Sequence, residues 1–409
     1  MGQMYKMNYN IENSNRVLKS TKIGTVCILT YIASYYMRNL LGVLTPAMLD
    51  TGEYTKEYIG ILSSVYMIFY AIGQLTNGVL GDNFSPKRMV IAGLLITGLA
   101  SIIFPYSGNG ILQVVSFAFL GYGLSMLRGP LMKIISENTS TRHARIICSF
   151  FSSSGFIGAF IAGLFAVMFH WDIAFIVAGA LVYVIALVAY VILTYLEREE
   201  ILTYKFVKNE KTSDIFSAFR ADKFVFYMII GILVEIASTS ISFWIPTYLT
   251  ENLSFNNNSA NVIFIVKSLL HSFSPFIAIF IYKYANDEIK IIKYSFLASS
   301  ILFVGILFTK SVWINITMFL LSLVISGFAS AMLWSIYIPS LKKTGKVSSA
   351  NGILDCAGYV GAAAANMVFA EIAGNIGWNG VIIIWAIIMI LGYGISLYEQ
   401  FIIRKKGLK

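Results

Sequence analysis

Charged residues and cysteines are both scarce in this sequence. Only 12% of its 409 residues are charged and 57% are hydrophobic, whereas a soluble domain has about 25% charged residues. This composition argues strongly against a water-soluble enzyme, and no set of nucleophile, base and orienting acid can be assembled from the sequence. The three cysteines, Cys27, Cys148 and Cys356, lie far apart in apolar stretches, so we predict no disulfide framework, no metal site and no cofactor.

Positive charge exceeds negative charge, but the basic residues do not gather on one element. The chain has 30 Lys and Arg residues against 20 Asp and Glu residues, a net charge of +10. A nucleic-acid binder needs its basic residues clustered on one face, whereas these lie between apolar segments. We therefore predict no nucleic-acid partner.

Long apolar runs fill most of the chain. A transmembrane helix needs about 20 mostly apolar residues, and the first such run, which follows 22 polar residues, is too long for a signal peptide. Because lipid offers no water to the backbone, runs of this length are helices. We predict an all-α integral membrane protein with twelve transmembrane helices in the lipid bilayer. The predicted spans are 23–48, 57–81, 89–107, 111–137, 144–169, 172–195, 224–250, 257–285, 292–309, 313–340, 347–373 and 378–403.

Lysine and arginine lie almost wholly on one side of these predicted spans. Outside the spans, all of them fall on the side of the N-terminus except Lys56 and Lys310. Because basic loops stay in the cytoplasm, we expect both termini to be cytoplasmic. The protein is then a multi-pass protein of the plasma, or inner, membrane.

The longest polar stretch divides six predicted spans from six others. It indicates two six-helix halves joined by a cytoplasmic linker. The predicted parts are a cytoplasmic N-terminal segment (1–22), a first half (23–195), a linker (196–223), a second half (224–403) and a cytoplasmic tail (404–409).

The two halves also repeat one another. Gly155-Phe-Ile-Gly-Ala159 recurs as Gly358-Tyr-Val-Gly-Ala362, Trp171 recurs as Trp378, and Pro46 recurs as Pro246, always 200 to 207 residues apart. Repeated halves are typical of secondary transporters, which bind their solute near the midplane of the membrane.

A motif after the second span resembles the major facilitator superfamily, and the resemblance covers essentially the whole chain. The motif is Gly78-Val-Leu-Gly-Asp82 followed by Pro86-Lys87-Arg88, with Asn83-Phe84 in place of the usual small and basic residues. The resemblance implies two pseudo-symmetric six-helix halves. It also implies a conformational role for Gly78, Asp82, Lys87 and Arg88. The alternative interpretation of the motif is an ordinary basic loop.

Further residues resemble one branch of that superfamily, the organophosphate:phosphate antiporters, and nearly as well the anion:cation symporters. They are Tyr35-Tyr-Met-Arg38-Asn39, Tyr70 and Trp244-Ile-Pro-Thr-Tyr-Leu249. In the antiporters an arginine from the first span and another from the seventh hold the phosphate, with tyrosines nearby. The resemblance therefore implies that Arg38, Tyr35, Tyr70 and Trp244 bind substrate.

The match departs from the antiporters at two positions. Aligning Pro46 with Pro246 places Ser238 opposite Arg38, where the antiporters have their second arginine. Gln74 stands where some antiporters have a basic residue. The exchange of a phosphate ester for phosphate is therefore only one possibility, and other organic anions remain candidates for the solute.

Buried charges give an independent argument for an anionic solute. Each buried cation costs about 2.5–3.5 kcal/mol at a helix centre, so it must face a cavity or a partner. The cations within the spans outnumber the deep acids, and a net positive cavity favours an anion. The cations are Arg38, Arg128, Lys133 and Lys267, and the acids are Glu235 and Asp355.

The cations differ in the roles that we predict for them. Arg38 is the leading anion ligand, because it is central, always charged and able to grip an oxyanion with two hydrogen bonds. Arg128 is the next candidate, unless it has a structural role in a pair with Glu137 or at a helix end. Lys267 and His271 share one helix face, where Lys267 can replace the missing arginine. His271 either binds the solute, relays a proton or packs.

The two deep acids have two possible roles each. Glu235 and Asp355 either titrate during transport, carrying a coupling proton, or neutralise a buried cation. Proton symport and anion exchange, with phosphate as the exchanged ion, are both open.

These observations predict a secondary transporter rather than an enzyme. It moves a small organic anion, such as a sugar phosphate, a sugar acid or another carboxylate, by alternating access, and it functions as a monomer. The alternatives are a transporter of a neutral sugar or drug-like solute, and a transporter-like ligand sensor.

Overall fold

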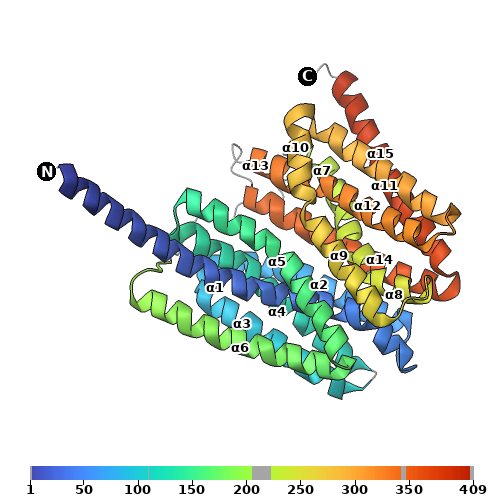
Figure 1. Cartoon of the computed structure of the whole chain (residues 1–409), viewed down its shortest axis with the longest axis horizontal. Coiled ribbons are helices and arrows are strands. Elements are labelled where there is room, and N and C mark those ends of the chain that lie inside the picture. Colours follow the sequence, from blue (N-terminus) through green and yellow to red (C-terminus); the bar gives the residue numbers. More distant parts are fainter. Residues whose placement is uncertain (1, 109, 205–222, 342–346, 406–409) are drawn as a thin grey trace.

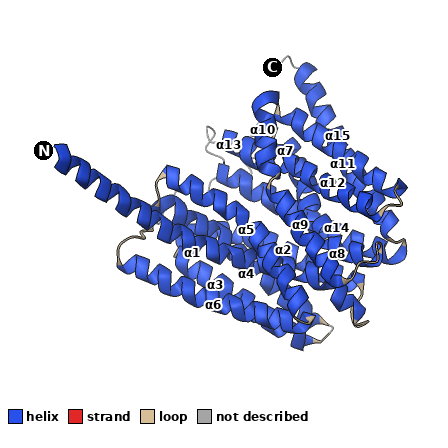
Figure 2. Ribbon diagram, viewed as in Figure 1, coloured by secondary structure: helices blue, strands red, loops and turns tan. Residues whose placement is uncertain are grey.

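Helices account for the regular structure of the described chain. The computed structural model describes residues 2–108, 110–204, 223–341 and 347–405. Within these ranges every regular element is a helix (Figure 2). Most of the predicted linker (196–223) and of the predicted tail (404–409) lies outside the described residues.

The first half consists of six long helices. They are α1 (Gly2–Asp50), α2 (Lys56–Asn83), α3 (Pro86–Ile103), α4 (Ile111–Asn138), α5 (Thr141–Met168) and α6 (Trp171–Arg198), with a 3₁₀ turn, η1 (Phe104–Ser107), after α3. Local sequence sets several of these starts: the Thr55 side chain accepts a hydrogen bond from the Tyr58 N–H at the start of α2, and Pro86 opens α3. The segment before the first predicted span continues α1 back to Gly2.

The second half contains interrupted spans. Its elements are α7 (Phe224–Glu235), η3 (Ile236–Ile241), α8 (Ser242–Glu251), α9 (Asn257–Ser272), α10 (Ser274–Ala285), α11 (Glu288–Phe308), α12 (Val312–Ala331), η4 (Met332–Tyr337), α13 (Ile338–Ser340), α14 (Val347–Asn375) and α15 (Trp378–Lys405). The segments η3 and η4 are π-helical, and α9 and α10 meet at Phe273. The sequence had predicted one continuous helix for each of these spans.

Two of the interruptions have a proline close by. A proline has no N–H for the carbonyl group four residues earlier, so it weakens the helix there. Pro246 follows the end of η3 by five residues, and Pro275 opens α10 just after the break at Phe273.

The predicted membrane fold is confirmed. Ten helices of the described chain are long and apolar enough to cross a membrane, and Ser154–Met168 of α5 adds a shorter apolar stretch. Counted with α1 and α5, and with η3, η4 and the α9–α10 break inside their spans, the described helices make twelve spans.

The two halves meet along helices that lie far apart in the sequence (Figure 1). Helix α2 packs against α14, α5 against α9, and α1 against α8. Small residues allow the approach: a Cβ added to Gly60 would lie 2.6 Å from the Ala370 Cβ, and one added to Gly163 would lie 2.6 Å from the Ile265 Cδ1.

Hydrogen bonds follow the contact between α2 and α14, which we call the α2–α14 seam. The Ser64 hydroxyl donates to the Ala363 carbonyl at 2.7 Å, and the Asn366 side-chain amide donates to the Ser63 hydroxyl at 2.7 Å. The other amide atom of the fully buried Asn366, Oδ1, has no hydrogen-bond partner among the described residues.

The contacts between the halves gather at the end of the molecule away from both termini. Lys56 at the start of α2 pairs with Glu251 at the end of α8 (2.8 Å), and Asn257 donates to Asp50 (3.0 Å). Asp50 ends α1 and therefore lies opposite the N-terminus. The described contacts thus close the halves from their middle to this far end.

The repeated glycine pairs occupy equivalent places in the two halves. In the first half, a Cβ added to Gly158 would lie 2.3 Å from the Tyr35 Cβ. In the second half, a Cβ added to Gly358 would lie 2.5 Å from the Glu235 Cγ. Each pair lets one helix pack closely on its neighbour, and it does so where Tyr35 or Glu235 lies.

Candidate functional site

Arg38 lies in the middle of the molecule, on α1, and contacts the other half. Its Nη1 donates a hydrogen bond to the hydroxyl of Tyr359 on α14, at 2.7 Å. The guanidinium also lies 5.0 Å from the centre of the Tyr359 ring and 5.9 Å from the centre of the Tyr70 ring. These cation–π contacts and the hydrogen bond hold the fixed charge of Arg38 between two neutral phenols.

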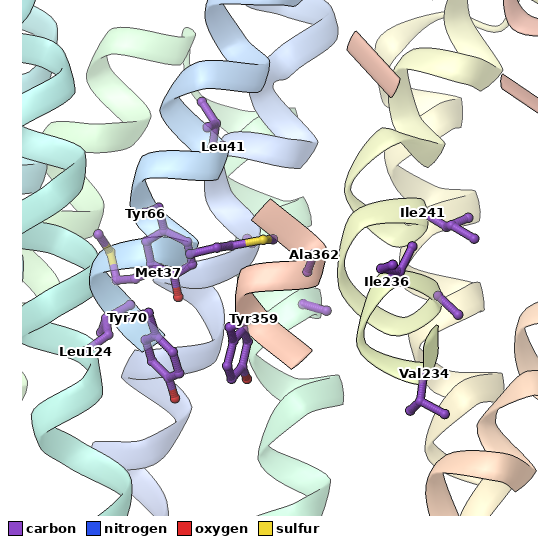
Figure 3. Close-up of a cluster of buried hydrophobic side chains, with 14 of the residues drawn as sticks. Met37, Leu41, Tyr66, Tyr70, Leu124, Val234, Ile236, Ile241, Tyr359 and Ala362 are labelled. Carbon is purple, nitrogen blue, oxygen red and sulfur yellow. The ribbon is translucent and has the colours of Figure 1, made fainter. Parts of the chain in front are cut away.

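Tyrosines surround this guanidinium on α2 and α14. The Tyr70 and Tyr359 rings meet edge to face, with centres 4.7 Å apart, and Tyr66 and Tyr70 follow one another on α2 (Figure 3). The Tyr66 hydroxyl is buried and has no hydrogen-bond partner in the described chain. It is thus a free donor and acceptor beside the arginine.

Tyr359 was not among the predicted site residues, although it lies inside the repeated Gly358-Tyr-Val-Gly segment. The signal was the tyrosine between two helix-packing glycines of a central span. Predicted Tyr35 lies nearby in sequence on α1 and stacks edge to face on Tyr31, with ring centres 5.2 Å apart.

Glu235 approaches the same region from the second half. It is buried at the end of α7, just before the π-helical turn η3, and accepts a hydrogen bond from the Ser238 hydroxyl at 3.5 Å. Within the described residues no ion pair joins it to a cation. It nevertheless interacts electrostatically with Arg38, Arg128 and Asp355, so these four charges share one region.

Arg128 and Asp355 form an ion pair between the halves. The Arg128 Nη1 on α4 lies 3.4 Å from the Asp355 Oδ2 on α14. The Arg128 side chain is 40% exposed, whereas that of Asp355 is 6% exposed. Asp355 and Tyr359 are one helical turn apart, so one stretch of α14 contacts both Arg38 and Arg128.

Lys267 on α9 is a second buried cation. It is 6% exposed, its Nζ lies 5.1 Å from the centre of the Phe264 ring, and the charged group that acts on it is Arg38. Within the described chain it has no ion-pair partner. The ring of His271, one turn further, lies against α12: a Cβ added to Gly327 would lie 3.0 Å from its Cε1, and its buried Nδ1 has no hydrogen-bond partner among the described residues.

Trp244 lies in a different environment. It is fully buried in an aromatic cluster of the second half, 5.1 Å from the Phe243 ring centre and 6.4 Å from that of Trp378. No described contact joins it to Arg38. A role in substrate binding therefore rests on the sequence resemblance alone.

The predicted loop motif lies at the C-terminal end of α2 and the start of α3. Lys87 forms an ion pair with Glu197 at the end of α6, and Arg88 is exposed. Gly78 and Asp82 belong to α2, but their side chains lie outside the described residues. A pocket of about 450 Å³ opens here, lined by Phe84, Ser85, Lys87, Arg88, Glu197, Leu202 and Tyr204.

Tyr204 closes one wall of this pocket. Burial, with the nearby charge of Glu197 as a further cause, raises the pKa of the Tyr204 hydroxyl above its ordinary value. The phenol therefore stays neutral beside the Lys87–Glu197 pair.

Two curated relatives are similar to parts of this chain. A phosphoglycerate transporter protein of Salmonella typhimurium is 24% identical over 265 residues, which are 58% of this chain and 57% of the relative. A probable sulfoacetate transporter of Cupriavidus necator is 30% identical over 101 residues, 25% of this chain and 23% of the relative. The chain thus spans between about a quarter and three fifths of these relatives.

One solved structure shares the whole fold. A bacterial homologue of the human lysosomal transporter Spinster, in an inward-facing and unoccupied conformation, superimposes with a TM-score of 0.77 at 11% sequence identity, over 92% of this chain and 96% of that one. The family model of the Major Facilitator Superfamily matches residues 27–341. With this match over most of its length and twelve helical spans, the chain belongs to the Major Facilitator Superfamily and is a membrane transporter, not an enzyme.

Proposed function

We propose that the protein is a secondary transporter of a small organic anion, which binds at Arg38 between the two halves. The observation that carries this proposal is the placement of Arg38: a permanent charge at the centre, bonded to a neutral phenol and without an acid partner among the described residues. A buried charge without a counterion is costly, and a bound oxyanion offsets that cost.

The other central charges support an anion. Arg128 and Asp355 largely cancel one another. Lys267 adds a second cation and Glu235 adds one acid, so the centre keeps a net positive charge. The hydroxyls of Tyr66 and Tyr359 at Arg38 can donate to the remaining lone pairs of a phosphate, carboxylate or sulfonate. The names of the two relatives, transporters of phosphoglycerate and sulfoacetate, describe anions of this kind.

The places where the halves touch support transport by alternating access. In the described structure they are closed at the end away from the termini, so a solute enters from the side of the termini. With both termini in the cytoplasm, as the basic loops indicate, this is the inward-open state of a plasma membrane protein. Rocking would open the α2–α14 seam and the contact between α5 and α9.

Four charged residues then have roles in the transport cycle. Asp355 pairs with Arg128 across the two halves and gates the site. Lys87 and Arg88 of the loop motif have a conformational role at the start of α3, where Lys87 pairs with Glu197 at the end of α6. Glu235 accepts a positive charge during the cycle, either a coupling proton in symport or another cation. A single chain with two halves is a complete transport unit, so the protein functions as a monomer.

Binding and transport test this proposal together. Purified protein is screened by thermal shift against 3-phosphoglycerate, glucose 6-phosphate, sulfoacetate and glucose, because a ligand of the folded state raises its apparent stability. We expect a shift with at least one anion and its loss in Arg38→Ala. Lys293→Ala is the matched control, since Lys293 is also a buried cation but bonds Gln400 on α15.

Uptake into proteoliposomes completes the test. The anion that shifts the melting temperature should be taken up by the wild type and by Lys293→Ala, but not by Arg38→Ala. A shift with glucose alone, or uptake that survives the loss of Arg38, would contradict the proposal and favour a neutral solute. Binding without any uptake would favour a sensor.

A further inference from the structure

We propose that the transported anion also carries an ammonium group, so that the cargo is a zwitterion whose anionic group binds Arg38 and whose ammonium group binds Glu235. This inference rests on the proposed function and specifies the second group of its cargo. The inference concerns the part of the site that carries Glu235, which an anion bound at Arg38 does not contact.

The carboxylate of Glu235 has unfilled hydrogen-bonding capacity. Its two oxygens can accept about four hydrogen bonds, whereas the structure gives the side chain one, from the Ser238 hydroxyl at a long 3.5 Å. The residue is about nine-tenths buried, and a buried carboxylate without a positive partner is unfavourable. The site therefore lacks a cationic donor at this position.

None of the three central cations forms an ion pair with Glu235 in the described part of the chain. Arg38 bonds Tyr359, Arg128 pairs with Asp355, and Lys267 lies over the Phe264 ring. Arg38 and Glu235 act on each other electrostatically without forming an ion pair. A molecule between them meets a positive group on the first half and a negative group on the second.

The structure fits Glu235 into a notch that only glycine allows. A Cβ on Gly358 of α14 would lie 2.5 Å from the Glu235 Cγ and 3.1 Å from its Cβ. The equivalent notch of the first half, at Gly155 and Gly158, holds the neutral ring of Tyr35. Tyr35 and Glu235 thus occupy equivalent packing positions, but only the second half has an acid there. Helix packing at this position therefore does not require a carboxylate.

Charge balance favours an ammonium group over a hydroxyl group. Arg38, Arg128 and Lys267 against Glu235 and Asp355 leave one net positive charge. A phosphate monoester carries about −1.5 to −2, and with an ammonium group its net charge comes close to −1. Such a cargo, when it has no further acidic group, neutralises the site and places an ammonium group at Glu235, whereas a plain phosphate ester leaves Glu235 facing a dianion.

Matched ligand pairs test this inference. Phosphoserine and 3-phosphoglycerate differ by an amine in place of a hydroxyl group, and so do glucosamine 6-phosphate and glucose 6-phosphate, and taurine and isethionate. Affinities for the intact protein are measured by calorimetry. We expect the aminated member of at least one pair to bind about tenfold more tightly or better, because an ion pair replaces a neutral hydrogen bond.

Two variants assign the preference to Glu235. Glu235→Gln should reduce the ratio within the pair to about one while the hydroxyl member still binds. Gly358→Ala should reduce the ratio too, because it displaces the Glu235 side chain without removing its charge. Gly361→Ala is the control: its added Cβ would lie 2.5 Å from Ile232 on the same two helices, so the ratio should stay unchanged.

The outcomes separate this inference from the proposed function. If hydroxyl members bind through Arg38 but no aminated member is preferred, the anion site stands and the zwitterion is wrong. The zwitterion is equally wrong if Glu235→Gln removes the pH dependence of uptake without altering the ratio, which would make Glu235 a proton carrier. If no pair binds at all, both proposals fail. If Glu235→Gln does not fold, the affinity ratios within the ligand pairs are compared between Glu235→Asp and the wild type, and these ratios test the inference.

Discussion

The two halves of this transporter differ in the helices that carry Arg38, Arg128 and Glu235. In the first half, α1 and α4 carry Arg38 and Arg128 and remain α-helical through Pro46 and Pro130. In the second half, Glu235 directly precedes the π-helical turn η3. π-helical turns are rare, strained and common at functional sites. Arg38 and Arg128 thus sit on continuous helices, while Glu235 sits beside a π-helical turn.

Proline alone does not produce the difference. Pro46 and Pro246 are repeats of one another, yet only the second lies close to a wide turn. The two prolines therefore occupy equivalent positions in the repeat, and the halves differ in how other residues pack around them. We infer that the second half supplies the movement and that the first half supplies the fixed anion ligand.

Exchanging the central arginine between the halves should have the largest effect. In Arg38→Ser with Ser238→Arg, the charge moves to the equivalent position of the second half. We expect anion affinity to fall by about 100-fold or more, because the contacts of Arg38 with Tyr70 and Tyr359 are lost. Calorimetry with the anion found by screening measures it. Wild-type affinity in the double variant would show instead that the halves are interchangeable.

Breaking the ion pair between the halves should have the next largest effect. Arg128→Gln and Asp355→Asn should each slow uptake by about tenfold, because each leaves one partner of a partly buried pair without its counterion. The double variant should be slowed by less than the product of the two single effects. Uptake rates in proteoliposomes give this double-mutant cycle. Independent, multiplying effects would contradict a functional pair.

Removing the Tyr359 hydroxyl should have a moderate effect. Tyr359→Phe keeps the ring against Arg38 but loses the 2.7 Å hydrogen bond, so anion affinity should change by about five- to tenfold. Tyr70→Phe is the control, because Tyr70 contacts the guanidinium through the face of its ring. An equal effect of the two variants would mean that ring packing alone positions Arg38.

Restoring a backbone donor beside η3 should have the smallest effect. Pro246→Ala supplies an N–H for the Ser242 carbonyl and favours a regular α-helix. We expect uptake to slow by about two- to threefold and thermal stability to rise slightly, whereas Pro46→Ala in the unbroken α1 should leave the rate unchanged. Equal uptake rates for Pro246→Ala and the wild type would contradict the inference that the second half supplies the movement.

The sequence predicted the fold because length and apolarity suffice for it. Each span is a local property of about 20 residues, and lipid permits little besides helices. Arg38, Arg128 and Lys267 were identifiable because charge in an apolar run is visible without coordinates.

Partners and interruptions were beyond the sequence. Arg38 and Tyr359 are 321 residues apart, and Arg128 and Asp355 are 227 apart. Such pairs depend on how the two halves dock. The turn η3 likewise reflects tertiary packing rather than propensity, as the unbroken helix around Pro46 demonstrates.

The amide of Asn366 has a consequence for how readily the two halves part. In the closed α2–α14 seam its Oδ1 is buried and has no partner among the described residues, which costs about 1–3 kcal/mol. Once the seam parts, water can reach that oxygen and recover part of this energy. The closed arrangement is therefore less stable, by part of this amount, than a seam with every polar group paired, and opening it costs correspondingly less.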